Sequence, residues 1–332
     1  MIVMRWAAVA ACFVAAAPAG AVPLNAFSSF YVLGDSLSDV GNVYDASLHR
    51  EPASPPYWHG RFTNGPNWAD RVANAFDAQG VRADNLAWGG ALADGGAVPD
   101  IGMQASQYRL LDRDKLGDRP LVAIWGGGND IIQSAGKKRA REDARDAAAA
   151  IGDAARTLAR SGAEDIMIFD LPDLGKIPKF RGNAEKSPSA SAASRVFNRR
   201  LAIQVDRLRD RGVAVYQVGA AALFQSLLDD PASFGITNVT KPCYDDGDLC
   251  SRRQQSRWAF FDSIHPNRTV HRALADAALA SLKSGPSGNR IATLVAAPAS
   301  ASVAAPVPLP ASGLILVAAL ALAGVWFRRR AS

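Results

Sequence analysis

The sequence predicts an α/β fold in which helices cover both faces of a central parallel sheet, an αβα sandwich. Short apolar runs alternate along the chain with longer helical stretches, which is the pattern of βαβ units. Several of these runs end in turns rich in glycine and polar residues, as strands do at the carboxyl edge of such a sheet. The chain has 332 residues, 48% of them hydrophobic, and is long enough to bury a sizeable core.

Five apolar runs have the length and composition of buried strands. They comprise residues 30–33, 81–88, 121–125, 166–169 and 213–218. The second run ends at Gly89-Gly90 and the third at Gly126-Gly127-Gly128, and both glycine turns mark the end of regular structure. The fourth run is followed by prolines and a glycine within residues 172–178, which interrupt the chain again.

Helical stretches are expected between these runs. A helix is predicted to begin near Asn67, and the alanine-rich residues 140–160 favour a second one. Apolar residues recur at helical spacing at Phe197, Leu201, Val205 and Leu208. The last helix is predicted over residues 268–284. Residues 285–306 are dominated by Ser, Ala, Pro and Gly and indicate a linker, so one domain is expected over residues 22–284.

A candidate nucleophile, base and carboxylate occur in two short motifs far apart in the chain. Ser36 lies in Gly34-Asp35-Ser36-Leu37-Ser38, and Asp262 and His265 lie in Asp262-Ser263-Ile264-His265. A serine hydroxyl is a good nucleophile only when a base takes its proton, and that base needs an acid to orient it. Because Ser36 follows the first predicted strand, its hydroxyl would be presented at the carboxyl edge of the sheet. These residues indicate an enzyme.

Each of these residues also fits a structural role. Ser36 could cap a helix, Asp262 could be the N-cap of the helix after Pro266, and a lone histidine often has a structural role. The joint occurrence of the motifs favours catalysis. The other histidines are expected at the surface, and they are His49, His59 and His271. His59 also fits a position in a cleft.

Four short blocks in this order resemble the GDSL/SGNH family of serine esterases and lipases. The blocks read Gly34-Asp35-Ser36-Leu37-Ser38, Asn85-Leu86-Ala87-Trp88-Gly89-Gly90, Gly127-Gly128-Asn129-Asp130 and Asp262-Ser263-Ile264-His265-Pro266. The resemblance covers residues 28–283, and Gly41-Asn42 and residues 60–66 are similar to the lipase-type branch. It implies the flavodoxin-like SGNH hydrolase fold and a catalytic triad of Ser36, His265 and Asp262.

The resemblance also implies an oxyanion hole, the set of donors that stabilises the negative charge of acyl transfer. Its donors would be the backbone N–H groups of Ser36 and Gly90 and the side-chain amide of Asn129. A glycine turn and an asparagine after a glycine run also occur for structural reasons alone. No metal ion or organic cofactor is implied.

The expected substrates are carboxylic esters, cleaved through an acyl-enzyme on Ser36: lipid, lysophospholipid or short acyl esters. Trp58, Phe62 and Trp68 hint at an apolar cleft, although aromatic residues at this spacing more often belong to a core. A carbohydrate acetylesterase or a thioesterase would use the same chemistry. A cell-surface binding protein with an inert hydrolase fold is the alternative from another class.

The first 21 residues have the pattern of a secretory signal peptide. One positive charge at Arg5 precedes an apolar stretch that ends near Ala17. The small residues Ala19-Gly20-Ala21 then fit cleavage by signal peptidase before Val22. The apolar stretch is too short for a transmembrane helix, so export is expected.

The other end of the chain, residues 307–332, reads as a sorting or membrane tail. Val307-Pro308-Leu309-Pro310 precedes the uncharged residues 311–327, which Arg328-Arg329-Arg330 follows. A helix over the uncharged segment would reach about 25 Å, the lower limit for a membrane span, with the arginines on the cytoplasmic side. The tail resembles the VPLPA variant of the PEP-CTERM sorting signals of Gram-negative bacteria, which implies removal by an exosortase-type enzyme. A retained anchor on the outer side of the membrane fits equally.

The cysteines and the net charge bear on disulfide formation, zinc binding and nucleic-acid binding. Cys12 lies in the leader, and Cys243 and Cys250 bracket a short polar loop in which an oxidising compartment favours a disulfide. Two cysteines without a nearby pair of histidines make a poor zinc site. Four arginines lie in the terminal segments, so the net charge of +6 falls to +2 in the middle of the chain. Without a Lys/Arg stripe, binding to nucleic acid is not indicated.

Overall fold

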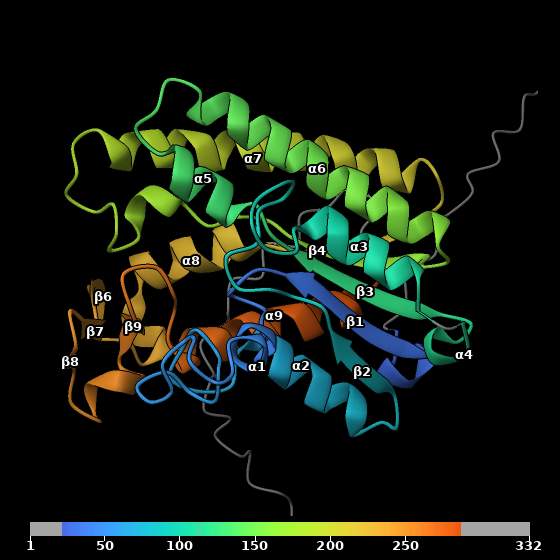
Figure 1. The fold of residues 1–332 in the computed structure, drawn as a ribbon, viewed down its shortest axis with the longest axis horizontal. Coiled ribbons are helices and arrows are strands. Elements are labelled where there is room, and N and C mark those ends of the chain that lie inside the picture. Colours follow the sequence, from blue (N-terminus) through green and yellow to red (C-terminus); the bar gives the residue numbers. More distant parts are fainter. Residues whose placement is uncertain (1–21, 112, 287–332) are drawn as a thin grey trace, which may run out of the picture. The chain divides into compact units, whose positions relative to one another are not determined.

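The computed structural model describes residues 22–111 and 113–286, which fold around a five-stranded parallel sheet (Figure 1). Its strands are β1 (Ser29–Gly34), β2 (Arg82–Asn85), β3 (Pro120–Trp125), β4 (Asp165–Phe169) and β5 (Ala214–Val218). They lie in the order β2-β1-β3-β4-β5, and every neighbouring pair is parallel. This is the flavodoxin-like strand order, so the predicted fold class is confirmed.

Helices form a layer on each face of this sheet (Figure 1). One layer contains α3 (Ile101–Arg109), α5 (Gly128–Ser134), α6 (Ala140–Arg160) and α7 (Lys186–Arg209). The other contains α2 (Trp68–Asp77) and α9 (Arg268–Ser284), with α8 (Ala220–Asp229) in contact with α9. Shorter helices are α1 (Asn42–Ala46), α4 (Arg113–Leu116) and the 3-10 turns Leu24–Ala26, Leu174–Lys176, Pro231–Phe234 and Gln254–Ser256.

Asparagine side chains explain where α2 and α9 begin. The Asn67 side chain accepts a hydrogen bond from the Asp70 N–H (2.9 Å), and the Asp70 carboxylate accepts one from the Asn67 N–H (3.0 Å). This reciprocal pair is a capping box. The Asn267 side chain accepts the N–H groups of Thr269 and Val270 at the start of α9. The N-cap of this helix is therefore Asn267 and not Asp262.

The second predicted strand is shorter in the structure than in the prediction. Regular pairing ends at Asn85, whose side-chain oxygen accepts the Ala87 N–H (2.9 Å) and turns the chain. The N–H of Trp88 still donates to the carbonyl oxygen of Gly34 at 3.0 Å. Residues 86–88 therefore continue alongside β1 without forming a strand, and they carry Gly90 toward the turn that follows β1.

The expectation that His271 lies at the surface is wrong. His271 is 1% exposed on the face of α9 that packs against α2, and its Nδ1 accepts the Trp68 N–H at 3.3 Å. Burial lowers the pKa of His271 to about 3, and the nearby charges of His265 and Arg71 act in the same direction. The spacing of His271 with the apolar residues Leu274, Ala275 and Ala278 is the signal that could have placed it in the core.

A small group of short strands precedes the motif that contains Asp262 and His265. The strand β6 (Asn238–Pro242) pairs in parallel with β9 (Trp258–Phe260), and β7 (Tyr244–Asp245) pairs antiparallel with β8 (Asp248–Leu249). A disulfide between Cys243 and Cys250 closes the β7–β8 hairpin. A ring of this size stabilises the folded state by about 2–3 kcal/mol in the loop-entropy account.

The leader predicted over residues 1–21, including Cys12, and the tail predicted over residues 307–332 lie outside the described residues, as does the predicted linker beyond residue 286. Within residues 22–111 and 113–286, no helix combines the length and the apolar character that crossing a membrane requires.

Candidate active site

The turn that carries Ser36 follows the carboxyl end of β1 and is held by short hydrogen bonds. The Asp35 carboxylate accepts the Leu37 N–H (3.0 Å), and the Asp35 carbonyl oxygen accepts the Ser38 N–H (3.0 Å). Glycine at position 34 permits this tight turn, because a Cβ there would lie 2.7 Å from the Ser38 Cβ. The half-buried Ser36 is thereby held at the edge of the sheet, where a ligand can reach it.

The structure brings Ser36, His265 and Asp262 into one hydrogen-bonded chain, although 229 positions separate the first two. His265 Nε2 lies 2.8 Å from Ser36 Oγ, and His265 Nδ1 lies 2.7 Å from Asp262 Oδ2. The other carboxylate oxygen, Asp262 Oδ1, accepts the backbone N–H groups of Ile264 and His265, both at 2.7 Å. The carboxylate is therefore fixed by its own loop and by the imidazole.

The loop from 261 to 265 is tied to its surroundings by main-chain hydrogen bonds. Phe261 N–H donates to the His265 carbonyl oxygen (2.8 Å), which closes the loop on itself. Lys179 N–H donates to the Ser263 carbonyl oxygen (2.8 Å), which connects the loop to the segment after β4. The ring of Phe62 lies 5.4 Å from the His265 ring, centroid to centroid. These contacts restrict the orientation of the imidazole.

Electrostatics within this chain favour an ionised carboxylate beside a readily protonated imidazole. Burial by itself raises the pKa of Asp262, but the charge of His265 and hydrogen bonds from His265 and Ile264 lower it to about 2. Burial lowers the pKa of His265, but the adjacent Asp262, with a smaller contribution from Asp35, raises it above its ordinary value. Asp262 therefore accepts the Nδ1 proton, which leaves Nε2 of the neutral imidazole as an acceptor for the Ser36 hydroxyl.

Asp35 is a buried carboxyl group next to the proposed nucleophile, and Asp130 is a half-buried one at the end of the third block. Burial raises the pKa of each to about 6, although backbone hydrogen bonds from Leu37 and Ala93, respectively, act against the rise. In the described part of the chain, neither carboxylate makes a hydrogen bond to Ser36 or His265. Within the same residues, no group of three or more His, Cys, Asp or Glu side chains is arranged to hold a metal ion.

The three expected oxyanion donors follow three adjacent strands of the sheet. Gly90 follows β2, Ser36 follows β1 and Asn129 follows β3, and these strands are neighbours in the order β2-β1-β3. Among the described residues, the backbone N–H groups of Ser36 and Gly90 have no hydrogen-bond acceptor. The Asn129 amide donates to the Ala91 carbonyl oxygen (2.9 Å), which joins the start of α5 to the loop after β2. Gly90 has a φ of +82°, a conformation that favours glycine.

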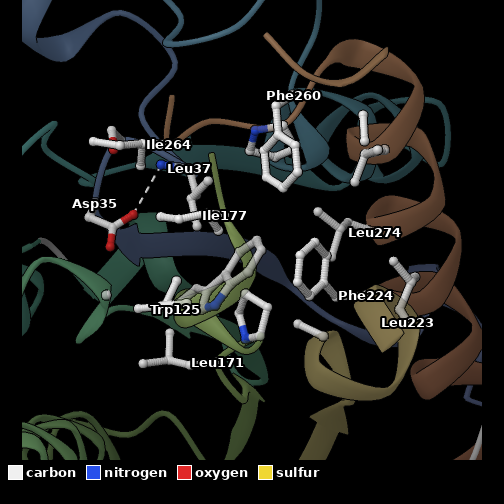
Figure 2. Close-up of a pocket in the computed structure, with 18 of the residues that line it drawn as sticks. Asp35, Leu37, Trp125, Leu171, Ile177, Leu223, Phe224, Phe260, Ile264 and Leu274 are labelled. Carbon is white, nitrogen blue, oxygen red and sulfur yellow. Dashed lines mark hydrogen bonds between the residues drawn. The ribbon is translucent and has the colours of Figure 1, made fainter. Parts of the chain in front are cut away.

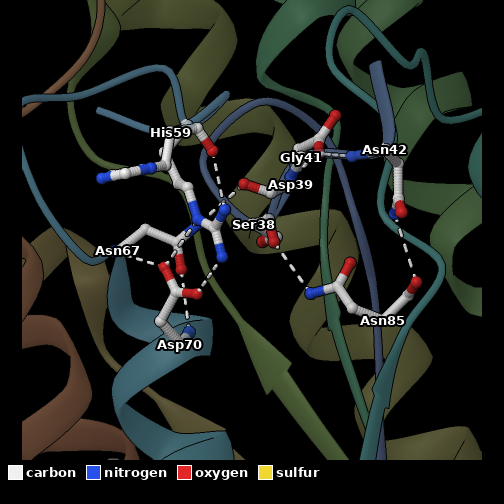
Figure 3. A network of polar contacts seen from close by, with 9 residues as sticks. Ser38, Asp39, Gly41, Asn42, His59, Asn67, Asp70 and Asn85 are labelled. Atoms are coloured by element: carbon white, nitrogen blue, oxygen red, sulfur yellow. Dashed lines mark hydrogen bonds and ion pairs between the residues drawn. The ribbon is translucent and has the colours of Figure 1, made fainter. Parts of the chain in front are cut away.

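Asp39, which was not among the predicted site residues, and Asn85 hold the second block against the Ser36 turn; Figure 3 shows the contacts of Asp39 with Gly41 and Asn42 and that of Asn85 with Ser38. The Asp39 carboxylate accepts the N–H groups of Gly41 (2.7 Å), Asn42 (2.7 Å) and Gly89 (2.8 Å). The Asn85 amide donates to the Ser38 carbonyl oxygen (2.9 Å), which adds a second connection. Gly90 is therefore positioned by residues that lie directly after the nucleophile motif. The position of Asp39 directly after the first block is the sequence feature that could have indicated its role.

An apolar pocket opens beside Ser36 (Figure 2). Its polar lining consists of Asp35, Ser36, Asn129 and the indole of Trp125. The remaining lining side chains are apolar and include Leu37, Ile132, Leu171, Leu174, Ile177, Leu223, Phe224, Leu227, Phe260, Ile264, Val270 and Leu274. In Figure 2, Asp35 and Ile264 lie at one end of the pocket and Leu223, Phe224 and Leu274 at the other. The pocket thus extends from the Ser36 turn toward α8 and α9.

The aromatic residues that hinted at a cleft do not line this pocket. Trp68 is completely buried and its ring lies 4.4 Å from that of Phe169, so it belongs to the core. Phe62 lies against His265, and Trp58 lies below the guanidinium of Arg61 at 5.2 Å. Apolar residues of α8 and α9 line the pocket instead. Their helical spacing is the same as that of core residues, so the sequence did not distinguish them as pocket residues.

Comparison with known proteins identifies the family. Residues 30–278 match the family model described as GDSL-like Lipase/Acylhydrolase. The chain belongs to this GDSL family. Its members in the comparisons carry the names of esterases and acyltransferases, and the present chain is accordingly an enzyme of the GDSL esterase/lipase type.

Several curated GDSL relatives align with most of the chain. The phosphatidylcholine-sterol acyltransferase of Aeromonas hydrophila is 28% identical over 78% of this chain and 91% of its own length. The thermolabile hemolysin of Vibrio parahaemolyticus is 27% identical over 75% of this chain and 62% of its own length. Esterase EstA of Pseudomonas aeruginosa is 30% identical over 81% of this chain and 49% of its own length. The chain thus spans nearly all of the first relative but less than two thirds of the other two.

Solved structures are similar at lower identity. An acetylxylan esterase from Geobacillus stearothermophilus, solved as a catalytic mutant, is 15% identical with a TM-score of 0.46. The match covers 77% of this chain and 94% of that chain.

Proposed function

We propose that this GDSL enzyme is an exported serine hydrolase that cleaves carboxylic esters of lipids through Ser36, His265 and Asp262. The observation that carries the proposal is the hydrogen-bonded chain from Ser36 Oγ to Asp262 at the end of an apolar pocket. The disulfide between Cys243 and Cys250 supports export, since such bonds persist in oxidising compartments.

In the proposed reaction, His265 Nε2 takes the Ser36 proton as Oγ attacks the ester carbonyl carbon. The tetrahedral intermediate collapses, and the imidazolium returns the proton to the leaving alcohol, which leaves an acyl group on Ser36. A water molecule, deprotonated by the same imidazole, then attacks the acyl-enzyme; the bond to Ser36 Oγ breaks, the imidazolium returns the proton to Oγ, and the acid is released. Throughout, Asp262 holds Nδ1–H and stabilises the transient positive charge of His265.

The oxyanion of the intermediate would be held by the N–H groups of Ser36 and Gly90 and by the Asn129 amide. Both backbone groups lack an acceptor among the described residues, so they are available for a ligand oxygen. The Asn129 amide has a second N–H besides the one bound to Ala91, and Asn129 lines the pocket. The groups that polarise the carbonyl would thus surround the carbon that Ser36 attacks.

Asn129→Ala should lower kcat by about 10²- to 10³-fold, because one oxyanion donor is lost where charge develops in the transition state. KM should change little, since the amide binds the ground-state carbonyl weakly. Steady-state kinetics on a p-nitrophenyl ester would measure both constants. A thermal melt of the variant checks that the lost bond to Ala91 has not unfolded the loop. A fall in kcat of less than threefold in a folded variant would contradict the oxyanion role.

The apolar pocket favours an acyl chain longer than acetyl. An acetyl group would leave the apolar lining at α8 and α9 without a partner, whereas an alkyl chain gains about 0.8 kcal/mol for each methylene that it buries. The name of the Aeromonas relative refers to transfer of an acyl group from a phospholipid, which supports the same substrate class. A carbohydrate acetylesterase is therefore the weaker assignment for this site.

Leu223→Trp should shorten the acyl chain that the pocket accepts. Leu223 is 8% exposed on α8 and lines the end of the pocket far from Asp35 (Figure 2). We expect kcat/KM on p-nitrophenyl decanoate to fall by about tenfold or more, while the value on the acetate ester stays within about twofold, since only the long chain reaches the added ring.

Gln225→Trp provides the matched control, because Gln225 lies on the exposed side of the same helix. It should leave the ratio of decanoate to acetate activity unchanged. An equal loss of both activities in Leu223→Trp, or a wild-type enzyme that accepts acetate esters alone, would contradict acyl-chain binding in this pocket.

A further inference from the structure

Tyr57 contacts the proposed catalytic acid from a distant part of the sequence. It lies in the loop between α1 and α2, 205 positions before Asp262, and its hydroxyl donates a hydrogen bond of 2.7 Å to Asp262 Oδ2. The same oxygen accepts the His265 Nδ1 proton, also at 2.7 Å. Tyr57 is therefore a direct hydrogen-bond partner of the carboxylate that orients the base.

The Tyr57 ring is held in place by three other aromatic rings. Its centroid lies 5.1 Å from that of Phe261, 5.8 Å from that of Tyr244 and 6.3 Å from that of Phe62, each in an edge-to-face arrangement. Such pairs have a defined geometry as well as apolar contact. Tyr244 directly follows Cys243 of the disulfide, and its N–H donates to the Phe261 carbonyl oxygen at 2.6 Å. The hydroxyl thus reaches Asp262 from a fixed direction.

The hydrogen bond from Tyr57 takes one of the few acceptor sites of the Asp262 carboxylate. Each carboxylate oxygen has two lone-pair directions. Both directions of Oδ1 are used by the backbone N–H groups of Ile264 and His265, and those of Oδ2 by Tyr57 and the His265 imidazole. With Tyr57 in place, the imidazole has a single direction from which it can bind the carboxylate.

We propose that Tyr57 is a positioning residue of this active site, which locks the Asp262 carboxylate and sets the orientation and basicity of His265. The proposal rests on the esterase mechanism given above. By sharing Oδ2, the hydroxyl takes up part of the carboxylate's negative charge, so Asp262 stabilises the imidazolium less than an unshared carboxylate would. A base whose pKa stays closer to the working pH remains unprotonated in more of the enzyme molecules.

In the part of the chain that the structure describes, four other ionisable groups interact with Tyr57 or His265. Glu51 and Tyr244 act on Tyr57 through their charges, Asp35 acts on His265, and His265 acts on the buried His271. Burial is the main cause that raises the pKa of Tyr57, followed by the charge of Asp262 and their hydrogen bond, so the phenol stays protonated and remains a donor. Within the described residues, none of the other four groups makes a hydrogen bond to Oδ2.

The test is Tyr57→Phe, which keeps the ring and its three aromatic contacts but removes the hydroxyl. We expect kcat to fall by about tenfold with KM nearly unchanged, since one charge-assisted hydrogen bond is lost. The acidic limb of the kcat profile should move to higher pH, because an unshared carboxylate raises the pKa of His265. NMR titration of the His265 ring should show the same upward shift. An unmoved pKa in the folded variant would overturn the proposal.

Two further variants separate positioning from simple packing. Tyr44→Phe removes the hydroxyl of a half-buried tyrosine whose ring stacks on His49, and it should leave kcat and the pH profile unchanged. In an Asp262→Asn background, Tyr57→Phe should cost nothing further, since Tyr57 acts through the carboxylate. An equal loss in both backgrounds would overturn the proposal. The NMR titration needs no turnover, so it distinguishes failure of this proposal from failure of the esterase assignment.

Discussion

Replacement of Ser36 by alanine should lower kcat on any ester substrate by about 10⁴- to 10⁶-fold, the loss seen when a serine hydrolase loses its nucleophile. The variant keeps the Ser36 backbone N–H and the apolar pocket, so ester binding should persist while the acyl-enzyme cannot form. Kinetics on p-nitrophenyl esters would measure the loss. A fluorophosphonate probe should label the wild-type enzyme once per chain and fail to label the variant.

Ser263→Ala is the matched control for this experiment. Ser263 lies between Asp262 and His265 in the sequence, but its hydroxyl makes no hydrogen bond within the described residues. This control should retain activity and labelling. If the folded wild-type protein neither reacts with the probe nor hydrolyses esters, the inert binding protein becomes the better assignment. Residual activity in Ser36→Ala near the wild-type level would point to another nucleophile.

Replacement of Asp262 by asparagine should lower kcat by about 10³- to 10⁴-fold, close to the effect of the same change in a known serine protease triad. Asparagine has the same shape, and its oxygen can still accept the N–H groups of Ile264 and His265. Its NH₂ group, however, would face His265 Nδ1, which then becomes an acceptor. Nε2 carries the proton in that tautomer and cannot accept the one from Ser36.

Asp262→Asn distinguishes a catalytic role of Asp262 from a purely structural role in its loop. If Asp262 served only to hold its loop, asparagine would preserve the backbone contacts and activity would remain near the wild-type level. Asp100→Asn is a useful comparison, because Asp100 is a buried carboxylate that caps α3 by accepting the Met103 N–H at 2.7 Å. It should leave kcat within about threefold, since a cap contributes to stability and not to chemistry. Thermal melts would verify that both variants are folded.

Much of the fold was predictable because buried strands and amphipathic helices leave local patterns. Residues 140–160 and 268–284 were predicted as helices and form α6 and α9 with the same bounds. The five apolar runs correspond to the five strands of the sheet, although the second proved shorter. The Asn85 side chain ends that strand, and a pattern of apolar residues does not reveal a side chain that turns its own backbone.

The candidate site was predicted in part. Ser36, Asp262 and His265 were proposed together from their motifs, and the structure places them within hydrogen-bonding distance. Tyr57 and Asp39 were not proposed, since neither belongs to the motifs that suggested the chemistry. His271 was predicted at the surface of the last helix, yet the α9 face on which it lies is buried against α2.

Short motifs and the alternation of apolar and helical segments were enough to establish the family of folds and the chemistry to test at Ser36. Both depend on residues that are neighbours in the chain, so a sequence records them directly. The apolar pocket, the shared oxygen of Asp262 and the N–H groups of Ser36 and Gly90, which have no acceptor within the described residues, depend on segments that can be more than two hundred residues apart. Which distant side chains meet is set by packing of the whole sheet and its helices, and no local pattern encodes it.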